Sequence, residues 1–409
     1  MRISGVIEGF YGPPWTHNER LACIDFLGAQ GMNTYVWAAK QEPRHRDEWN
    51  SPFTDEECTQ FAELSTRHVG VQLSVALTPG SGATHVEVID KLRPAVDAGA
   101  TSLTLCVDDL PVLDAGAEHR EIAHAVLDAF SLPVWVVPTH YAGTSSSPYL
   151  QSLCDGLSAD VELMWTGVDV VNDVITAEHA RARKAATRNR APLLWDNTPV
   201  NDGLMREALH LGPFTGRDDE LRDICSGILL NPMEFMVASL PTLESAAAWV
   251  RGDNSLEAWN CAVDRDGWRM LAEATAFPVD AHWPGTEPSD DWWERAARVT
   301  DPTGDERLEP WVNAIRVRAI AVRAAHEISR ARERGASNRE ISKLFRPIVA
   351  WARRAVPPLV LGEGTRVRPM ATQDEHGEFV FNERSFSTNA GIATPIIERH
   401  IGMHSGDSH

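Results

Sequence analysis

Short runs of apolar and β-branched residues recur about every 30 residues through the first 250 positions of the chain. The eight runs span residues 3–9, 33–39, 70–77, 101–107, 132–138, 161–165, 191–196 and 227–231. Uninterrupted apolar runs are typical of strands that are buried on both faces, as in a parallel sheet covered by helices. The pattern therefore predicts eight buried parallel strands.

Amphipathic stretches separate these runs. Residues 17–30 place Leu21, Ile24 and Leu27 on one helical face. The same spacing occurs in residues 54–68, 84–98, 115–130 and 176–188. Strands that alternate with helices predict an α/β fold. Eight such units in about 250 residues favour a closed (β/α)8 TIM barrel, with a doubly wound open sheet as the alternative.

The pattern changes after about residue 250. Residues 255–276, 289–299 and 305–355 are rich in Ala, Arg, Glu and Leu at helical spacing, which predicts a small all-α helical domain. From residue 357 onward no period is sustained. We therefore expect three parts: a catalytic barrel over 1–250, a helical domain over 251–356, and an irregular or weakly ordered tail over 357–409.

Charge and composition narrow the class of protein. The chain has 409 residues, with 58 acidic against 38 basic ones, so its formal net charge is −20. This charge argues against a nucleic-acid partner or an anionic membrane surface. No apolar segment is long enough to span a membrane, and the first residues lack the apolar core of a signal peptide. These features predict a cytoplasmic protein.

Motifs for metals and cofactors are missing from the sequence. It contains no phosphate-binding glycine loop, no HxH after the first apolar run and no HExxH. Six scattered cysteines form no CxxC pair and are expected to be reduced, mostly buried residues. We therefore expect neither a metal nor a cofactor. The sequence does not support a homo-oligomer, although none is excluded.

Polar and aromatic residues follow seven of the eight predicted strands. The active sites of TIM barrels lie at the carboxyl ends of the strands. The positions are 8–12, Lys40, 108–109, 139–141, 165–167, 195–197 with Asn201 and Asp202, and Asn231. This concentration predicts a concave site for a ligand rich in hydroxyl groups.

The adjacent pair Asp108 and Asp109 carries the clearest chemical signal. Two neighbouring carboxylates resist ionising together, so one retains its proton and an acid lies beside a base. Lys40 could hold one of them ionised. Ordinary alternatives remain open: the aspartates could cap a helix, Lys40 could be solvated, and Tyr141 and Trp195 could pack at the rim. Turn formation is the corresponding alternative for Asn197, Asp202 and Asn231.

Seven motifs, in order over about residues 3–250, carry a family resemblance. They are GVIEGFYGPPW, AAKQEPRHR, DDL, PTHYAGT, WTG, WDNTPVND and LLNP. Together they resemble glycoside hydrolase family 84, the β-N-acetylglucosaminidases that include protein O-GlcNAc hydrolases. The resemblance implies a barrel enzyme that removes terminal β-linked GlcNAc with retention. In its mechanism the sugar's own 2-acetamido oxygen is the nucleophile and an oxazoline forms.

The resemblance also implies roles for individual residues. Asp108 would orient the acetamido group, and Asp109 would act as general acid and then as general base. Tyr141 would hydrogen-bond the acetamido oxygen, and Trp195 would line the acetyl pocket. Further sugar contacts would come from Gly9, Lys40, Asn197, Asp202 and Asn231. One departure is His140, where the family often has a glutamate before the tyrosine.

The implied ligand is a GlcNAc-containing glycoside or glycoconjugate. Two alternatives to an exo-acting enzyme stay open at this stage. One is an endo-acting, hyaluronidase-like hydrolase, which would differ on the side of the leaving group. The other is a catalytically silent GlcNAc-binding protein on the same barrel, although a binding protein needs no general acid.

Overall fold

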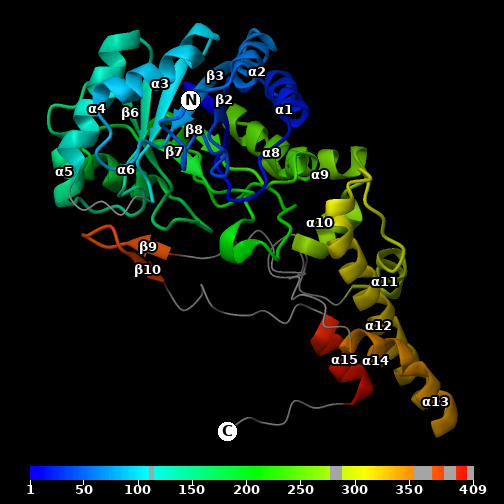
Figure 1. Cartoon of the computed structure of the whole chain (residues 1–409). Coiled ribbons are helices and arrows are strands. Elements are labelled where there is room, and N and C mark those ends of the chain that lie inside the picture. Colours follow the sequence, from blue (N-terminus) through cyan, green and yellow to red (C-terminus); the bar gives the residue numbers. More distant parts are fainter. Residues whose placement is uncertain (110–114, 277–287, 354–370, 382–392, 403–409) are drawn as a thin grey trace. The chain divides into compact units, whose positions relative to one another are not determined.

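The computed structural model describes residues 1–109, 115–276, 288–353, 371–381 and 393–402 (Figure 1). The chain divides into two compact units. The barrel unit comprises Met1–Met205, Pro213–Ala258 and Val367–Phe386. The helical unit comprises Arg206–Gly212, Trp259–Arg366 and Ser387–His409. The first unit thus runs past the expected boundary at residue 250 and takes up a segment from near the C-terminus.

Eight parallel strands close into a barrel in sequence order, which confirms the predicted (β/α)8 fold. They are β1 (Ile3–Glu8), β2 (Thr34–Trp37), β3 (Gln72–Leu77), β4 (Ser102–Cys106), β5 (Val134–Val137), β6 (Val161–Trp165), β7 (Leu193–Asp196) and β8 (Gly227–Leu230). Almost every residue of these strands is buried. Burial on both faces explains why the runs are uniformly apolar rather than alternating.

Helices surround the barrel, and several begin with the same local signal. They are α1 (His17–Ala29), α2 (Asp55–Thr66), α3 (His85–Asp97), α4 (Gly116–Phe130), α5 (Pro148–Cys154), α6 (Ala177–Ala186), α7 (Leu221–Ile224) and α8 (Met236–Arg251), with a 3-10 turn η1 (Gly203–Met205). At the start of α1, α2 and α3, a threonine side chain accepts the backbone N–H of a glutamate three residues later. The side chain of that glutamate accepts the backbone N–H of the threonine, which completes a capping box. These caps fix where each loop from a strand end becomes a helix.

A buried ion pair fixes the carboxyl end of β1. Glu8 is fully buried, and Arg20 of α1 donates to both of its carboxylate oxygens at 2.9 and 3.0 Å. The backbone N–H of Trp15 and the hydroxyl of Tyr35 donate to the same carboxylate. A buried carboxylate needs such partners. They anchor the loop that carries Gly9 to the barrel mouth.

The helical unit is built around one long helix, as the helical spacing predicted. Its elements are α10 (Arg269–Ala276), α11 (Asp290–Ala296), η2 (Glu306–Leu308), α12 (Glu309–Glu333), α13 (Asn338–Leu344), α14 (Arg346–Arg353) and α15 (Ala393–Ile401), while α9 (Ser255–Arg265) crosses the boundary between the units. The apolar face of α12 packs against α11, α14 and α15. None of the helices in the described ranges is long and apolar enough to cross a membrane.

The structure differs from the expected irregular tail over 357–409. Its described residues contain β9 (Ala371–Gln373) and β10 (Phe379–Phe381), which form a two-stranded antiparallel hairpin, and the helix α15. Strands of three residues are too short to show a period in the sequence. The remainder of the expected tail lies outside the described residues.

Candidate active site

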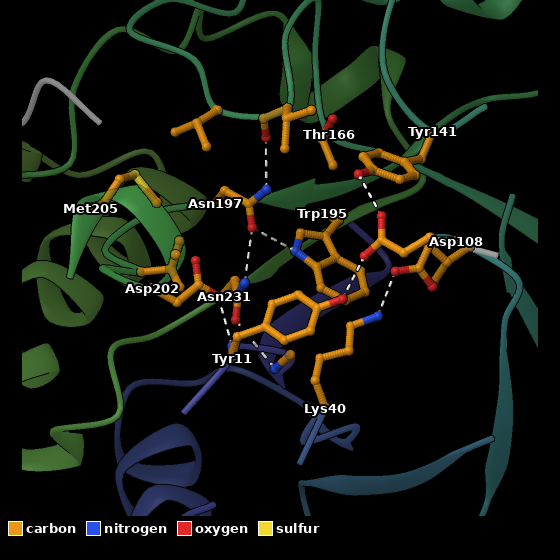
Figure 2. Close-up of a pocket in the computed structure, with 17 residues that line it drawn as sticks. Tyr11, Lys40, Asp108, Tyr141, Thr166, Trp195, Asn197, Asp202, Met205 and Asn231 are labelled. Carbon is orange, nitrogen blue, oxygen red and sulfur yellow. Dashed lines mark hydrogen bonds and ion pairs between the residues drawn. The ribbon is translucent and has the colours of Figure 1, made fainter. Parts of the chain in front are cut away.

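A pocket of about 290 Å³ opens at the carboxyl ends of the barrel strands (Figure 2). This volume lies near the lower limit for small-molecule sites. The structure brings all nine sequence-predicted residues into its lining: Gly9, Lys40, Asp108, Asp109, Tyr141, Trp195, Asn197, Asp202 and Asn231. The groups that were separate candidates in the sequence therefore form one site.

Asp108 and Lys40 form a buried ion pair in this pocket. Lys40 Nζ lies 2.5 Å from Asp108 Oδ2, and both side chains are buried. Burial alone would lower the pKa of the Lys40 ammonium, but the surrounding acidic groups, Asp108 foremost, together outweigh burial and raise the pKa. Burial raises the pKa of Asp108, and Lys40 opposes that shift. Among the described residues, Asp108 Oδ1 is a buried acceptor without a hydrogen-bond partner, and Asp108 is one of the residues that line the pocket.

Asp109 faces the same pocket because the backbone turns between the two aspartates. Its φ is +53°, in the left-handed region that aspartate tolerates better than most residues. Its oxygens accept hydrogen bonds from two tyrosine hydroxyls, Tyr11 at 2.7 Å and Tyr141 at 3.1 Å. Arg46 donates to the Tyr11 hydroxyl at 2.8 Å. The orientation of the Asp109 carboxyl is thus fixed from two sides.

A chain of hydrogen bonds orders the opposite wall. Trp195 Nε1 and Asn231 Nδ2 each donate to Asn197 Oδ1 at 2.9 Å. Asn231 Oδ1 in turn accepts from the backbone N–H of Gly9 at 3.2 Å. A Cβ atom at Gly9 would lie 2.4 Å from the Trp195 ring, so only glycine allows this approach. The wall is therefore rigid and combines one aromatic face with amide groups.

Sequence reasoning left several lining residues out of the site. Tyr11 and Thr166 were noted at strand ends but were not assigned to ligand binding, and both line the pocket. Tyr11 also donates its backbone N–H to Asp202 Oδ2 at 2.7 Å. Arg46 is the last residue of the AAKQEPRHR motif after β2, but the motif alone assigns it no role in the site. Burial raises the pKa of Tyr11 and of Asp202, so the tyrosine remains a hydrogen-bond donor.

The comparison with protein families decides the classification. A family model described as β-N-acetylglucosaminidase matches residues 4–275, which is about two thirds of the chain. The chain belongs to the β-N-acetylglucosaminidase family. This confirms the resemblance to glycoside hydrolase family 84 and identifies the barrel as that of a glycoside hydrolase.

Individual relatives agree with this assignment. The chain is 30% identical to protein O-GlcNAcase of Rattus norvegicus, and equally to that of Mus musculus, over 277 residues. The match covers 61% of this chain but only 30% of those longer proteins. In fold, the chain is similar to an O-GlcNAc hydrolase mutant of Thermobaculum terrenum, with a TM-score of 0.74, 23% identity, and coverage of 86% and 88% of the two chains. It is also similar in fold to CpGH84B, with a TM-score of 0.76, 21% identity, and coverage of 98% and 77%.

These comparisons do not test the cytoplasmic location or the absence of a nucleic-acid partner, which stay predictions. Among the residues that the structure describes, no group of three or more histidine, cysteine, aspartate or glutamate side chains could hold a metal ion.

Proposed function

We propose that this protein is a retaining exo-β-N-acetylglucosaminidase that works by substrate-assisted catalysis. The observation that carries the proposal is the carboxylate of Asp108, a pocket-lining residue that is held by Lys40 on Oδ2 and whose buried Oδ1 has no partner among the described residues. A buried acceptor without a partner costs free energy, which a donor on the substrate would recover. The acetamido N–H of GlcNAc is such a donor.

Asp108 orients the nucleophile in this mechanism. It accepts the acetamido N–H, which turns the acetamido carbonyl oxygen toward the anomeric carbon. Positive charge grows on the forming oxazoline as that oxygen attacks. The interaction with the Asp108 carboxylate is therefore stronger in the transition state than in the ground state.

Asp109 acts first as the general acid and then as the general base. As the bond between the anomeric carbon and the leaving oxygen breaks, Asp109 gives its proton to that oxygen and becomes a carboxylate. It then removes a proton from water, which attacks the anomeric carbon and returns the bonding electrons to the acetamido oxygen. Two inversions at the anomeric carbon give net retention. Tyr11 and Tyr141 hold the Asp109 carboxyl in place through both steps.

The remaining pocket groups suit one neutral sugar ring. Trp195 offers an apolar face for the acetyl methyl group, and Asn231 and Asp202 offer polar atoms for ring hydroxyls. The small pocket favours a single terminal GlcNAc over an internal unit of a polymer, which supports exo action. From the names of the mammalian relatives, we propose protein-linked O-GlcNAc as one substrate class.

The first test compares 4-nitrophenyl β-GlcNAc with the corresponding β-glucoside. A substrate-assisted enzyme hydrolyses the former and rejects the latter, which lacks the nucleophile. Among N-acyl analogues, rates should fall with successive fluorine substitution because the carbonyl oxygen becomes a weaker nucleophile. A flat series together with a sugar trapped on an aspartate would overturn the mechanism. Binding of GlcNAc without hydrolysis would indicate a binding protein instead.

Asp108→Asn provides a second test of the same mechanism. The substitution removes the charge and keeps the approximate shape. It should lower kcat by about 10²–10⁴, the range for one preorganised electrostatic contact or one acid–base group. Thermal unfolding measures whether the Asp108→Asn protein is still folded. A kcat within a few-fold of the wild type would contradict the role of Asp108.

A further inference from the structure

We propose that the hairpin of β9 and β10 forms the leaving-group side of the active site, with Phe379 as the residue that contacts the first unit of the aglycone. This inference rests on the proposed function, because it assumes a glycoside whose leaving group departs from Asp109. The ligand feature that Phe379 would recognise is an apolar or planar face, such as that of an aromatic ring, a pyranose ring or a peptide unit.

The hairpin is anchored to two of the loops that line the pocket, those after β5 and β6. Gln373 Oε1 accepts the backbone N–H of Ala142 at 2.9 Å, and its Nε2 donates to the carbonyl of Thr139 at 2.9 Å. These two residues flank Tyr141. On the next loop, the N–H of Val170 donates to the carbonyl of Ala371 at 2.6 Å. A segment more than 130 residues beyond β8 thus belongs to the barrel unit and bonds to the loops after β5 and β6.

Strand register shows which side of the hairpin Phe379 occupies. Phe379 pairs with Gln373 across the antiparallel hairpin, and residues directly opposite share a face. The Gln373 side chain reaches the backbone beside Tyr141, and Phe379 on the same face lies against the Tyr141 ring. Val380 pairs with Thr372 on the other face, where the Thr372 hydroxyl donates to the carbonyl of Val168 at 2.9 Å.

Phe379 lies close to the residues that surround Asp109, the proposed general acid, which suits it to contact the leaving group. Its ring centroid lies 6.3 Å from that of Tyr141, whose hydroxyl donates to Asp109. The ring remains 43% exposed, although it contacts a residue of the pocket wall. In the proposed mechanism Asp109 protonates the leaving oxygen, so the aglycone departs past Asp109 and its neighbours. Phe379 therefore offers an exposed aromatic face beside that exit.

A contact between Phe379 and the aglycone should affect which leaving groups the enzyme prefers, without changing how tightly it binds GlcNAc. Phe379→Ala should lower kcat/KM about 3- to 10-fold for substrates whose aglycone offers a planar or apolar face, the value of one aromatic contact. Inhibition by free GlcNAc, which has no aglycone, should not change. Phe379→Tyr keeps the aromatic face and should restore the wild-type value. Val380→Ala, next in sequence and 49% exposed on the other face, is the matched control.

The experiment uses the full chain and three substrates: 4-nitrophenyl β-GlcNAc, chitobiose and an O-GlcNAc serine peptide. Loss with Phe379→Ala for any of them, without loss for Val380→Ala, supports the proposal, and the substrates affected identify the kind of aglycone. No loss with any substrate, equal losses in both variants, or a matching change in GlcNAc inhibition would overturn it. Failure of the wild-type protein to hydrolyse 4-nitrophenyl β-GlcNAc would instead overturn the proposed function on which this inference rests.

Discussion

At the scale of single residues, two adjacent aspartates receive different surroundings from one turn of the backbone. Asp108 is paired with a lysine and Asp109 with two tyrosine hydroxyls. The positive φ of Asp109 allows both side chains to enter the pocket from consecutive positions. The two carboxyl groups are thereby prepared for separate tasks, one electrostatic and one in proton transfer.

Replacing the proton donor should affect substrates unequally. Asp109→Asn is expected to slow glycosides with basic leaving groups far more than those with acidic ones, because only a basic leaving oxygen needs a proton in the transition state. The measurement is kcat/KM along a series of aryl β-GlcNAc substrates of increasing phenol pKa. A steeper dependence in Asp109→Asn than in the wild type is expected. Parallel lines for the two proteins would argue against an acid role.

The charge of Lys40 should set the acidic limb of the pH profile. Lys40 lowers the pKa of Asp108 against the effect of burial. Removing the ammonium therefore raises that pKa, so the ionised form of Asp108 is lost at a higher pH. We expect Lys40→Met to move the acidic limb of kcat/KM to higher pH. Arg46→Met should move it less, because Arg46 is a weaker influence on the same carboxyl.

At the scale of elements, the strands β9 and β10 are too short to show a hydrophobic pattern in the sequence. Contacts with the barrel hold the hairpin that they form. Its turn ends at Gly377, whose φ is +81°. A Cβ atom at Gly377 would lie 2.4 Å from His140 Nε2. His140 is fixed by Ser147 Oγ at 2.8 Å and by stacking on Tyr149, so it has little room to move away. The turn and the barrel surface therefore fit only with glycine at this position.

Gly377→Ala should release the hairpin from the barrel. The sensitive readout is hydrogen exchange at the amides of Ala142 and Val170, which donate to Gln373 and Ala371 of the hairpin. Local opening should make both amides exchange faster. Gly156→Ala is the control, because Gly156 has a similar φ of +75° with open space around it. Equal protection of these amides in Gly377→Ala and Gly156→Ala would show that a side chain at position 377 does not clash with His140 strongly enough to release the hairpin.

The same elements show what could be predicted from the sequence. The eight strands were visible because burial on both faces makes them uniformly apolar, and the site residues were visible because they follow those strands. The helices α5 and α7 have only seven and four residues, too few to show an amphipathic period. Gln373 and Phe379 gave no signal, because their contacts join them to residues more than 200 positions away. Arg46 lies in the AAKQEPRHR motif, but its contact with Tyr11 could not be predicted because the two residues are 35 positions apart.

At the scale of the whole molecule, one of the two units supplies the described pocket. Every pocket-lining residue belongs to the barrel unit, as does the described hairpin. The helical unit instead owes its packing to its own apolar surfaces, and Ile396 and Ile397 of α15 are buried in it. This division changes the expected effect of shortening the chain at its C-terminal end.

Deleting residues 387–409 should leave catalysis in place and weaken only the helical unit. The deletion removes α15 and exposes apolar residues of α12, so the helical unit should lose free energy of unfolding. Hydrolysis of 4-nitrophenyl β-GlcNAc should stay near the wild-type rate, because the pocket and hairpin remain.

Deleting residues 357–409 also removes the hairpin, and should reduce activity on substrates with extended aglycones while the barrel stays folded. Thermal unfolding and kcat/KM for both deletions separate these effects. A folded protein that lacks activity after the shorter deletion would show that the helical unit takes part in catalysis.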